Sequence, residues 1–219
     1  MTQAQARAPV QTGEAAPDFT LPAVHQEGSV SLSDYRGRSP LLLAIFRGLY
    51  CPFCRRAVAQ FGTLSDKLRR EGVESLAVVA TERDNARLYF KYRPARVPIA
   101  ADPDLVTHRA FGLPKPVVDQ HMMQAIENIK IDPTGELGKP VKLMEAAHEL
   151  DKVHGYQHTA TDARDSEKQG IQFKGQFLLD RDGIVRWANI ECASEGPAGF
   201  GKFPTDEELL DAVRKLTKQ

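Results

Sequence analysis

Continuous apolar runs alternate with amphipathic segments along the first half of the chain. The runs Leu41–Phe46 and Ser75–Ala80 have strand length and are typical of strands buried on both faces of a sheet. Between them, apolar residues recur every three or four positions over Val58–Leu68, and Gly72 follows, which predicts an amphipathic helix that ends at a glycine. A second helix is expected at about 82–92, before a proline.

A short strand at 97–100 and a short helix at 105–111 extend this strand–helix series. Such a series predicts an α/β fold with parallel strands and right-handed crossovers. Near the C-terminus, two β-rich runs flank the sequence Arg181-Asp182-Gly183 and predict a hairpin with a tight turn. Thr205 and Glu208 have the spacing of a capping box and predict the start of a last helix.

Residues 112–170 interrupt this alternation. One helical stripe of apolar residues covers 118–129, and another covers 143–154. The polar stretch 158–170 is interpreted as a solvated loop. We therefore interpret 112–170 as a helical insertion rather than as an independent domain.

The domain itself is expected to cover residues 13–219. The polar, alanine-rich residues 1–12 are expected to form a flexible tail. Within the domain, Ser33 is expected to cap a single helical turn, because serine oxygens accept hydrogen bonds from free N–H groups at helix starts.

Composition and charge exclude several classes of protein. Lys+Arg and Asp+Glu number 29 each among 219 residues, so the basic surplus that nucleic-acid or anionic-membrane binding needs is absent. The longest apolar run, 40–46, is too short to span a bilayer. The polar N-terminus does not resemble a secretory signal, so we expect a cytoplasmic protein. Three cysteines, an odd number, argue against a structural disulfide framework.

The most informative local sequence is FRGLYCPFCRR at 46–56, where Cys51 and Cys54 follow a buried strand. Pro52 suits the first position of a helix. The free N–H groups and the dipole of that helix would stabilise a thiolate at Cys51, and three arginines add positive potential: Arg47, Arg55 and Arg56. In comparable motifs the thiol pKa falls from about 8.5 to roughly 3.5–7.5. We therefore assign Cys51 as the nucleophile and Cys54, one turn later, as the resolving thiol.

The spacing of the cysteine pair is also compatible with a zinc site or with simple core packing. A zinc site needs at least two further ligands, and the sequence offers only Cys192 and scattered histidines such as His154 and His158. Alternatively, both cysteines simply fill the core, although the first thiol at a helix start is usually accessible. Cys192 is either a second resolving thiol or a bystander.

Several motifs in a fixed order carry a resemblance to a known family. The segment GEAAPDFTL at 13–21, the run 31–37, the strand followed by Cys51-Pro52, and the hairpin sequence LLDRDGIVRW resemble the peroxiredoxin-like branch of the thioredoxin superfamily. This is the alkyl hydroperoxide reductase and thiol-specific antioxidant group. The resemblance covers 13–111 and 171–217. It implies a thioredoxin-like fold, with a central mixed β-sheet flanked by helices, and a redox function without metal or cofactor.

The chain departs from the family pattern at three positions. Gly48 stands where typical peroxiredoxins carry a threonine that positions the peroxide, and Ala44 stands in place of a proline. Lys174 occupies the place of the second active-site arginine, where it either holds the anion of the nucleophile or is a solvated surface lysine. The short loop from Phe46 to Cys51 resembles that of thioredoxin instead.

Three functions follow as hypotheses. We favour an antioxidant enzyme that reduces hydroperoxides and receives electrons from a thioredoxin- or glutathione-type donor. The alternative is a thiol–disulfide oxidoreductase that acts on protein or glutathione disulfides. A third hypothesis is a redox-switched binding or sensing protein whose segment 112–170 docks a partner. A homodimer is compatible with the sequence.

Overall fold

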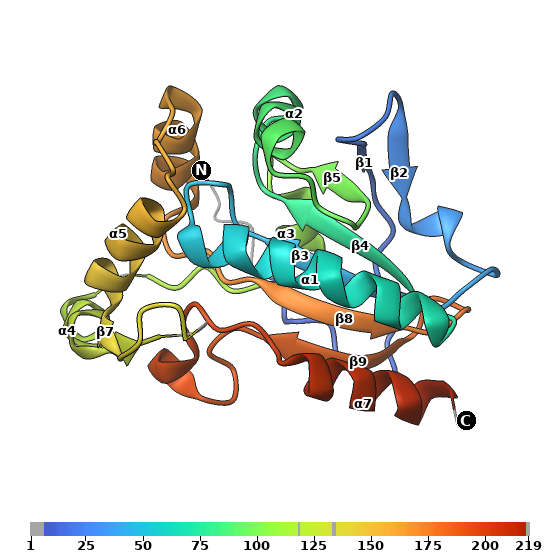
Figure 1. Cartoon of the computed structure of the whole chain (residues 1–219). Coiled ribbons are helices and arrows are strands. Elements are labelled where there is room, and N and C mark those ends of the chain that lie inside the picture. Colours follow the sequence, from blue (N-terminus) through green and yellow to red (C-terminus); the bar gives the residue numbers. More distant parts are fainter. Residues whose placement is uncertain (1–6, 118, 133–134, 218–219) are drawn as a thin grey trace, which may run out of the picture.

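A five-stranded mixed sheet forms the centre of the computed structural model, which describes residues 7–117, 119–132 and 135–217 (Figure 1). The strand order is β5-β4-β3-β8-β9, with bounds β3 Leu41–Phe46, β4 Glu74–Val79, β5 Ile99–Ala101, β8 Gly175–Leu179 and β9 Val185–Ile190. β3, β4 and β5 run parallel, β8 pairs antiparallel with β3, and β9 pairs antiparallel with β8. The expected α/β fold with a mixed sheet is thereby confirmed.

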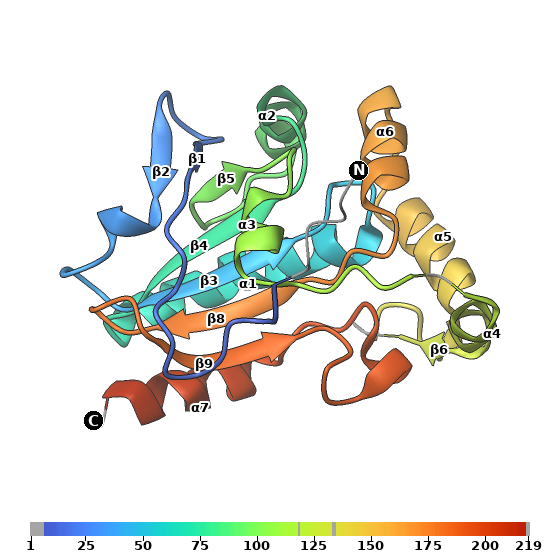
Figure 2. The same cartoon turned by 180° about the vertical axis from the view of Figure 1, so that it is seen from behind.

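The apolar runs of the central strands are continuous because both faces of the sheet pack against other parts of the chain. Leu42, Ala44 and Phe46 of β3 join a core with α1 (Pro52–Arg70), α2 (Arg83–Tyr92), α5 (Leu143–Val153) and α7 (Asp206–Thr217). The alternate β3 residues contribute to a second core, together with the N-terminal segment that passes over the other face (Figure 2). This segment includes the hairpin of β1 (Thr20–Pro22) and β2 (Ser29–Ser31), and α3 (Val106–Ala110) lies on the same side.

Local turn and cap predictions are confirmed with one exception. The β8–β9 hairpin closes through the N–H of Gly183 and the carbonyl of Asp180, 3.0 Å apart. Thr205 and Glu208 form the expected capping box of α7. The prediction of Ser33 as a helix cap is wrong. Ser31 occupies the cap of the 3-10 turn η1 (Leu32–Asp34), and its N–H donates to the Asp34 carboxylate.

The described residues of the segment 112–170 contain three helices, which lie beside the sheet near the start of α1 (Figure 1). They are α4 (Gln120–Asn128), α5 and α6 (Ala160–Gln169), with the short pair β6 (Lys130–Ile131) and β7 (Val141–Lys142) before α5. Val118 of the first predicted stripe lies outside the described residues.

The prediction of a solvated loop at 158–170 is wrong, because α6 occupies this stretch. Thr159 caps α6 together with Asp162. The buried face of this helix is polar, formed by Asp162, Asp165 and Gln169, so an apolar stripe could not reveal it.

The described part of the expected N-terminal tail, residues 7–12, packs on the domain through Val10, while most of its other residues are exposed. Residues 1–6 of the expected tail lie outside the described residues. In the remainder, Val10 is buried, and its N–H donates to the carbonyl of Phe111 at 3.1 Å. Within the described part of the chain, no helix combines the length and apolar character that a membrane crossing requires.

Candidate active site

Cys51 occupies the N-cap position of α1, directly after the loop that follows β3. Pro52 is the first helical residue, and the N–H of Cys54 donates to the Cys51 sulfur at 3.2 Å. Both thiols are free, and the exposed fractions are 5% for Cys51 and 1% for Cys54. The helix start is as predicted, but the first thiol is less accessible than expected.

The two thiols have opposite pKa shifts. Burial raises the pKa of Cys51, but a side-chain hydrogen bond from Cys54 and the charges of Arg47 and Lys174 outweigh burial and hold this pKa well below its usual range. Burial raises the pKa of Cys54 well above its usual range, and the anion at Cys51 adds to the rise. Cys51 is therefore a thiolate, as a nucleophile must be, while Cys54 stays protonated, as expected of the resolving thiol.

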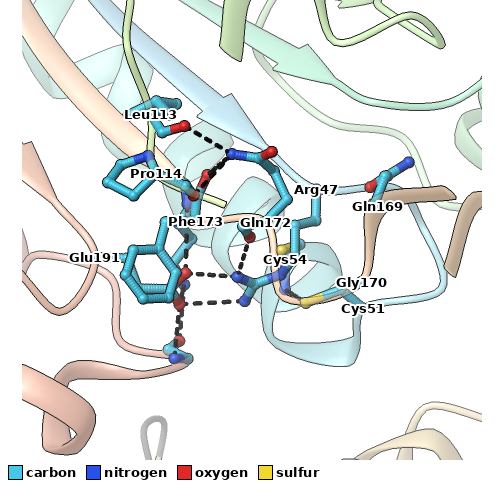
Figure 3. Close-up of polar contacts among 12 residues, drawn as sticks. Arg47, Cys51, Cys54, Leu113, Pro114, Gln169, Gly170, Gln172, Phe173 and Glu191 are labelled. Carbon is cyan, nitrogen blue, oxygen red and sulfur yellow. Dashed lines mark hydrogen bonds and ion pairs between the residues drawn. The ribbon is translucent and has the colours of Figure 1, made fainter. Parts of the chain in front are cut away.

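The positive charge comes from Arg47 and Lys174, which together with Glu191 form what we call the buried ionic cluster; Arg47 and Glu191 are labelled in Figure 3. Arg47 makes two hydrogen bonds to the Glu191 carboxylate, at 2.5 and 3.1 Å. Lys174 Nζ lies 3.6 Å from Glu191 Oε1 and donates to the carbonyl of Gly201 at 2.9 Å. Such mutual pairing is what allows charged groups to remain buried.

The charges of the cluster are unbalanced without the nucleophile. Arg47 and Lys174 carry two positive charges, and Glu191 carries one negative charge, since the two cations lower its pKa against the effect of burial. A thiolate at Cys51 is the second anion and brings the sum to zero. Lys174 is 1% exposed, so the alternative of a solvated surface lysine is wrong.

The three arginines predicted to act together are separated by the structure. Arg47 enters the buried ionic cluster. Arg55 donates to the carbonyl of Leu49 at 2.5 Å, pairs with Asp151, and lies 3.6 Å from the ring centre of Tyr156. Arg56 pairs with Glu136. Arg55 and Arg56 thus join α1 to the segment 112–170, whereas Arg47 supplies charge to Cys51.

Gly48 lies where a larger residue could not fit. A Cβ atom at this position would lie 2.9 Å from the carbonyl oxygen of Ala80 and 3.0 Å from a ring carbon of Tyr50. A Cβ contact of 2.9 Å to a backbone oxygen would force the backbone to move. The threonine that the family pattern places here is therefore excluded by packing.

Cys192 lies just beyond β9 in a left-handed conformation, with φ of 64°. It forms part of the wall of an apolar cavity of about 300 Å³ beside α4. Burial and the neighbouring Glu191 raise the pKa of Cys192 to about 12. A thiol with this pKa is almost fully protonated at neutral pH and is a weak nucleophile.

The histidines considered as zinc ligands are engaged by carboxylates. His154 contacts Glu136 at 3.1 Å, and His158 contacts Asp151 at 2.8 Å. Among the described residues, no group of three or more His, Cys, Asp or Glu side chains is arranged to hold a metal ion.

Sequence reasoning missed Glu191 and Gln169, both of which contact the active-site loop. Glu191 is 144 positions from Arg47, and Gln169 is 121 positions from Gly48. No local spacing encodes contacts of this length, and a single carboxylate or amide in a polar stretch gives no signal of burial.

Comparisons with known proteins agree with this geometry. A sequence model described as the AhpC/TSA family matches residues 12–188. A protein of Thermoplasma volcanium named peroxiredoxin is 25% identical over 208 residues, which cover 95% of this chain and 75% of that protein. The thiol-disulfide oxidoreductase ResA of Bacillus thuringiensis is 26% identical over 131 residues, 58% of this chain and 74% of its own.

The reduced 2-Cys peroxiredoxin of Plasmodium vivax has a similar fold, with a TM-score of 0.60 at 14% identity. The superposition covers 96% of this chain and 83% of that structure. The expected thioredoxin-like fold is confirmed.

Proposed function

The chain belongs to the AhpC/TSA family of peroxiredoxin-type thiol oxidoreductases, and from this premise we propose that it reduces hydroperoxides through Cys51 and Cys54. The observation that carries the proposal is the environment of Cys51. Its sulfur lies at a helix start, accepts a hydrogen bond from the Cys54 N–H, and has a lowered pKa beside two buried cations.

The reaction consists of two steps on the protein. The Cys51 thiolate attacks one oxygen of the peroxide, the O–O bond breaks, and the sulfur becomes a sulfenic acid while the other oxygen leaves as an alcohol or water after protonation. The Cys54 thiol then attacks the Cys51 sulfur, which forms a disulfide and releases water. A dithiol donor of thioredoxin type, or two glutathione-type thiols, supplies the two electrons that restore both cysteines.

Burial of the thiols supports a small substrate. Cys51 is 5% exposed, so a protein disulfide would need a large opening of the loop to bring its sulfur within bonding distance of Cys51. A hydroperoxide group is smaller and needs less space in the first step, whereas reduction of the finished disulfide by a protein donor needs the loop to open. Reduction of hydroperoxides is therefore the better supported of the two reactions.

Disulfide exchange is the second candidate, and the charge balance at the site bears on its direction. When Cys51 enters a disulfide its negative charge disappears, and Arg47, Lys174 and Glu191 are left with a net charge of +1 in a buried site. The uncompensated buried charge destabilises the disulfide form. Dithiol pairs whose reduced form is stabilised by a thiolate are oxidising for the same reason. We expect a reduction potential less negative than the value of about −270 mV typical of thioredoxin.

Mass spectrometry after treatment with one equivalent of hydrogen peroxide or an organic hydroperoxide tests the proposal. We expect a Cys51–Cys54 disulfide in the wild type and a sulfenic acid on Cys51 in Cys54→Ser. If Cys51 stays reduced over minutes in stopped-flow mixing, peroxide reduction is wrong. A Cys51–Cys192 disulfide would contradict the assigned role of Cys54. Efficient reduction of insulin without peroxide consumption would favour the second candidate.

A further inference from the structure

Gln169, the last residue of α6, is completely buried and reaches the active-site loop. Its side-chain oxygen accepts the N–H of Gly48 at 2.8 Å, and its side-chain nitrogen donates to the carbonyl of Ala80 at 2.6 Å. One carboxamide thus joins the loop after β3 to the residue that follows β4. Because both bonds are buried, losing either would leave a backbone group without its partner in the core.

Gly48 transmits this contact to the nucleophile. Its N–H is bound by Gln169, and its carbonyl accepts the N–H of Cys51 at 3.2 Å. Arg47, whose charge lowers the pKa of Cys51, immediately precedes Gly48 in the chain. The side chain of Gln169 is therefore connected to Cys51 by two successive hydrogen bonds, and to Arg47 by one hydrogen bond and one peptide bond.

The lack of a side chain at Gly48 permits this arrangement. A Cβ atom there would lie 3.2 Å from the Gln169 nitrogen as well as 2.9 Å from the Ala80 oxygen. Gly48 and Gln169 hence form a matched pair, in which the glycine leaves the space that the carboxamide fills.

The position of Gln169 is fixed independently of its own two bonds. On the same helix, Asp165 accepts a hydrogen bond from Thr81 at 2.5 Å, and Lys168 Nζ donates to the carbonyl of Pro103 at 2.6 Å. These contacts hold α6 beside the end of β4. The Gln169 carboxamide therefore already lies next to the loop, and its two hydrogen bonds form with little further loss of conformational entropy.

We propose that Gln169 is a positioning residue for Cys51. By fixing the Gly48 peptide it holds the loop that sets Cys51 and Arg47 in their places, and it thereby maintains Cys51 as a reactive thiolate. Its catalytic consequence rests on the proposed function, whereas its effect on the thiol does not.

Two substitutions test the proposal in the full-length protein. Gln169→Ala removes both hydrogen bonds, and we expect the pKa of Cys51, measured from thiolate absorbance at 240 nm, to rise by about one unit, which corresponds to about a tenfold shift in the ionisation equilibrium. Gln169→Glu keeps an acceptor for Gly48 but opposes the Ala80 carbonyl and adds a negative charge, so the rise should be larger. The rate of Cys51 alkylation by iodoacetamide at pH 6 should fall in the same order.

Glu167→Ala is the matched control, because Glu167 is an exposed residue of the same helix, two positions before Gln169. It should leave the Cys51 pKa and alkylation rate unchanged, and thermal unfolding of all variants reports the integrity of the fold. If Gln169→Ala unfolds, Gln169→Glu carries the test. A folded Gln169 variant with an unchanged Cys51 pKa and alkylation rate would overturn the proposal, even if its unfolding temperature were lower.

These measurements use no peroxide. A wild type that consumes no hydroperoxide, together with a raised Cys51 pKa in the Gln169 variants, would contradict the proposed function and support the role of Gln169.

Discussion

Cys51 and Cys192 experience charges from the same buried ionic cluster, yet their thiols are shifted in opposite directions. Arg47 and Lys174 lower the pKa of each. At Cys51 the final pKa lies well below the usual range, whereas at Cys192 it rises to about 12.

The two pKa values differ because different groups lie next to the two sulfur atoms. At Cys51, a side-chain hydrogen bond from Cys54 lowers the pKa, and the N–H of Cys54 also donates to the sulfur at the start of α1. At Cys192, burial raises the pKa, and the adjacent carboxylate of Glu191 adds to the rise. Nearby cations are therefore insufficient for a reactive thiol. The sulfur also needs hydrogen-bond donors directed at it, and it must lie away from the carboxylate of Glu191.

Removal of each thiol in turn should show the largest contrast. Cys51→Ser should reduce hydroperoxide turnover by at least about 10³-fold, because a hydroxyl at its ordinary pKa is a weak nucleophile. Cys192→Ser should keep turnover within about twofold, since its protonated thiol takes no part in the proposed steps. A coupled assay of peroxide consumption measures both. Equal losses in the two variants would contradict the distinction between the thiols.

Arg47→Met should weaken both the fold and the nucleophile. Removing one partner of a buried ion pair costs about 3–5 kcal/mol, so the free energy of unfolding in urea should fall by this amount. The pKa of Cys51 should move up toward or beyond about 8.5. Arg56→Met is the control, because the partly exposed Arg56–Glu136 pair contributes only about 0–1 kcal/mol. Similar losses in both variants would show that the buried ionic cluster has no special role.

A smaller effect is expected in the pH dependence of stability. Because the pKa of Cys51 is lower in the folded than in the unfolded protein, its thiolate adds stability that is complete above the unfolded pKa of about 8.5 and is lost as pH falls through the folded pKa. The stability of the reduced wild type should therefore rise with pH relative to Cys51→Ala across this window, each unit of pKa difference contributing about 1.4 kcal/mol. Parallel stability-versus-pH curves for the two proteins, from urea unfolding at about pH 5–9, would contradict the lowered pKa.

The sequence predicted the parts of the molecule that depend on local order. Continuous apolar runs indicated the buried strands, and the placement of Cys51 and Pro52 after such a run indicated the helix start. These features depend on neighbours within a few positions, where periodicity and capping preferences act.

The parts that escaped prediction depend on distant polar contacts. Glu191 approaches Arg47 only because β8 and β9 pair beside β3, and its burial has no local signature. Lys174 entered the prediction only through the family resemblance, which left its burial open. Likewise α6 buries aspartates and a glutamine, which a hydrophobic pattern assigns to solvent. Charged residues adopt such positions when tertiary partners compensate the loss of water.

The most direct test is the pH profile of alkylation at the two thiols of one protein. Reduced wild type is treated with iodoacetamide at a series of pH values, and peptide mass spectrometry gives separate rates for Cys51 and Cys192. We predict that the Cys51 rate has its midpoint well below about 8.5, while the Cys192 rate continues to rise in strongly alkaline solution. A common midpoint near about 8.5, or a lower midpoint for Cys192, would contradict the account.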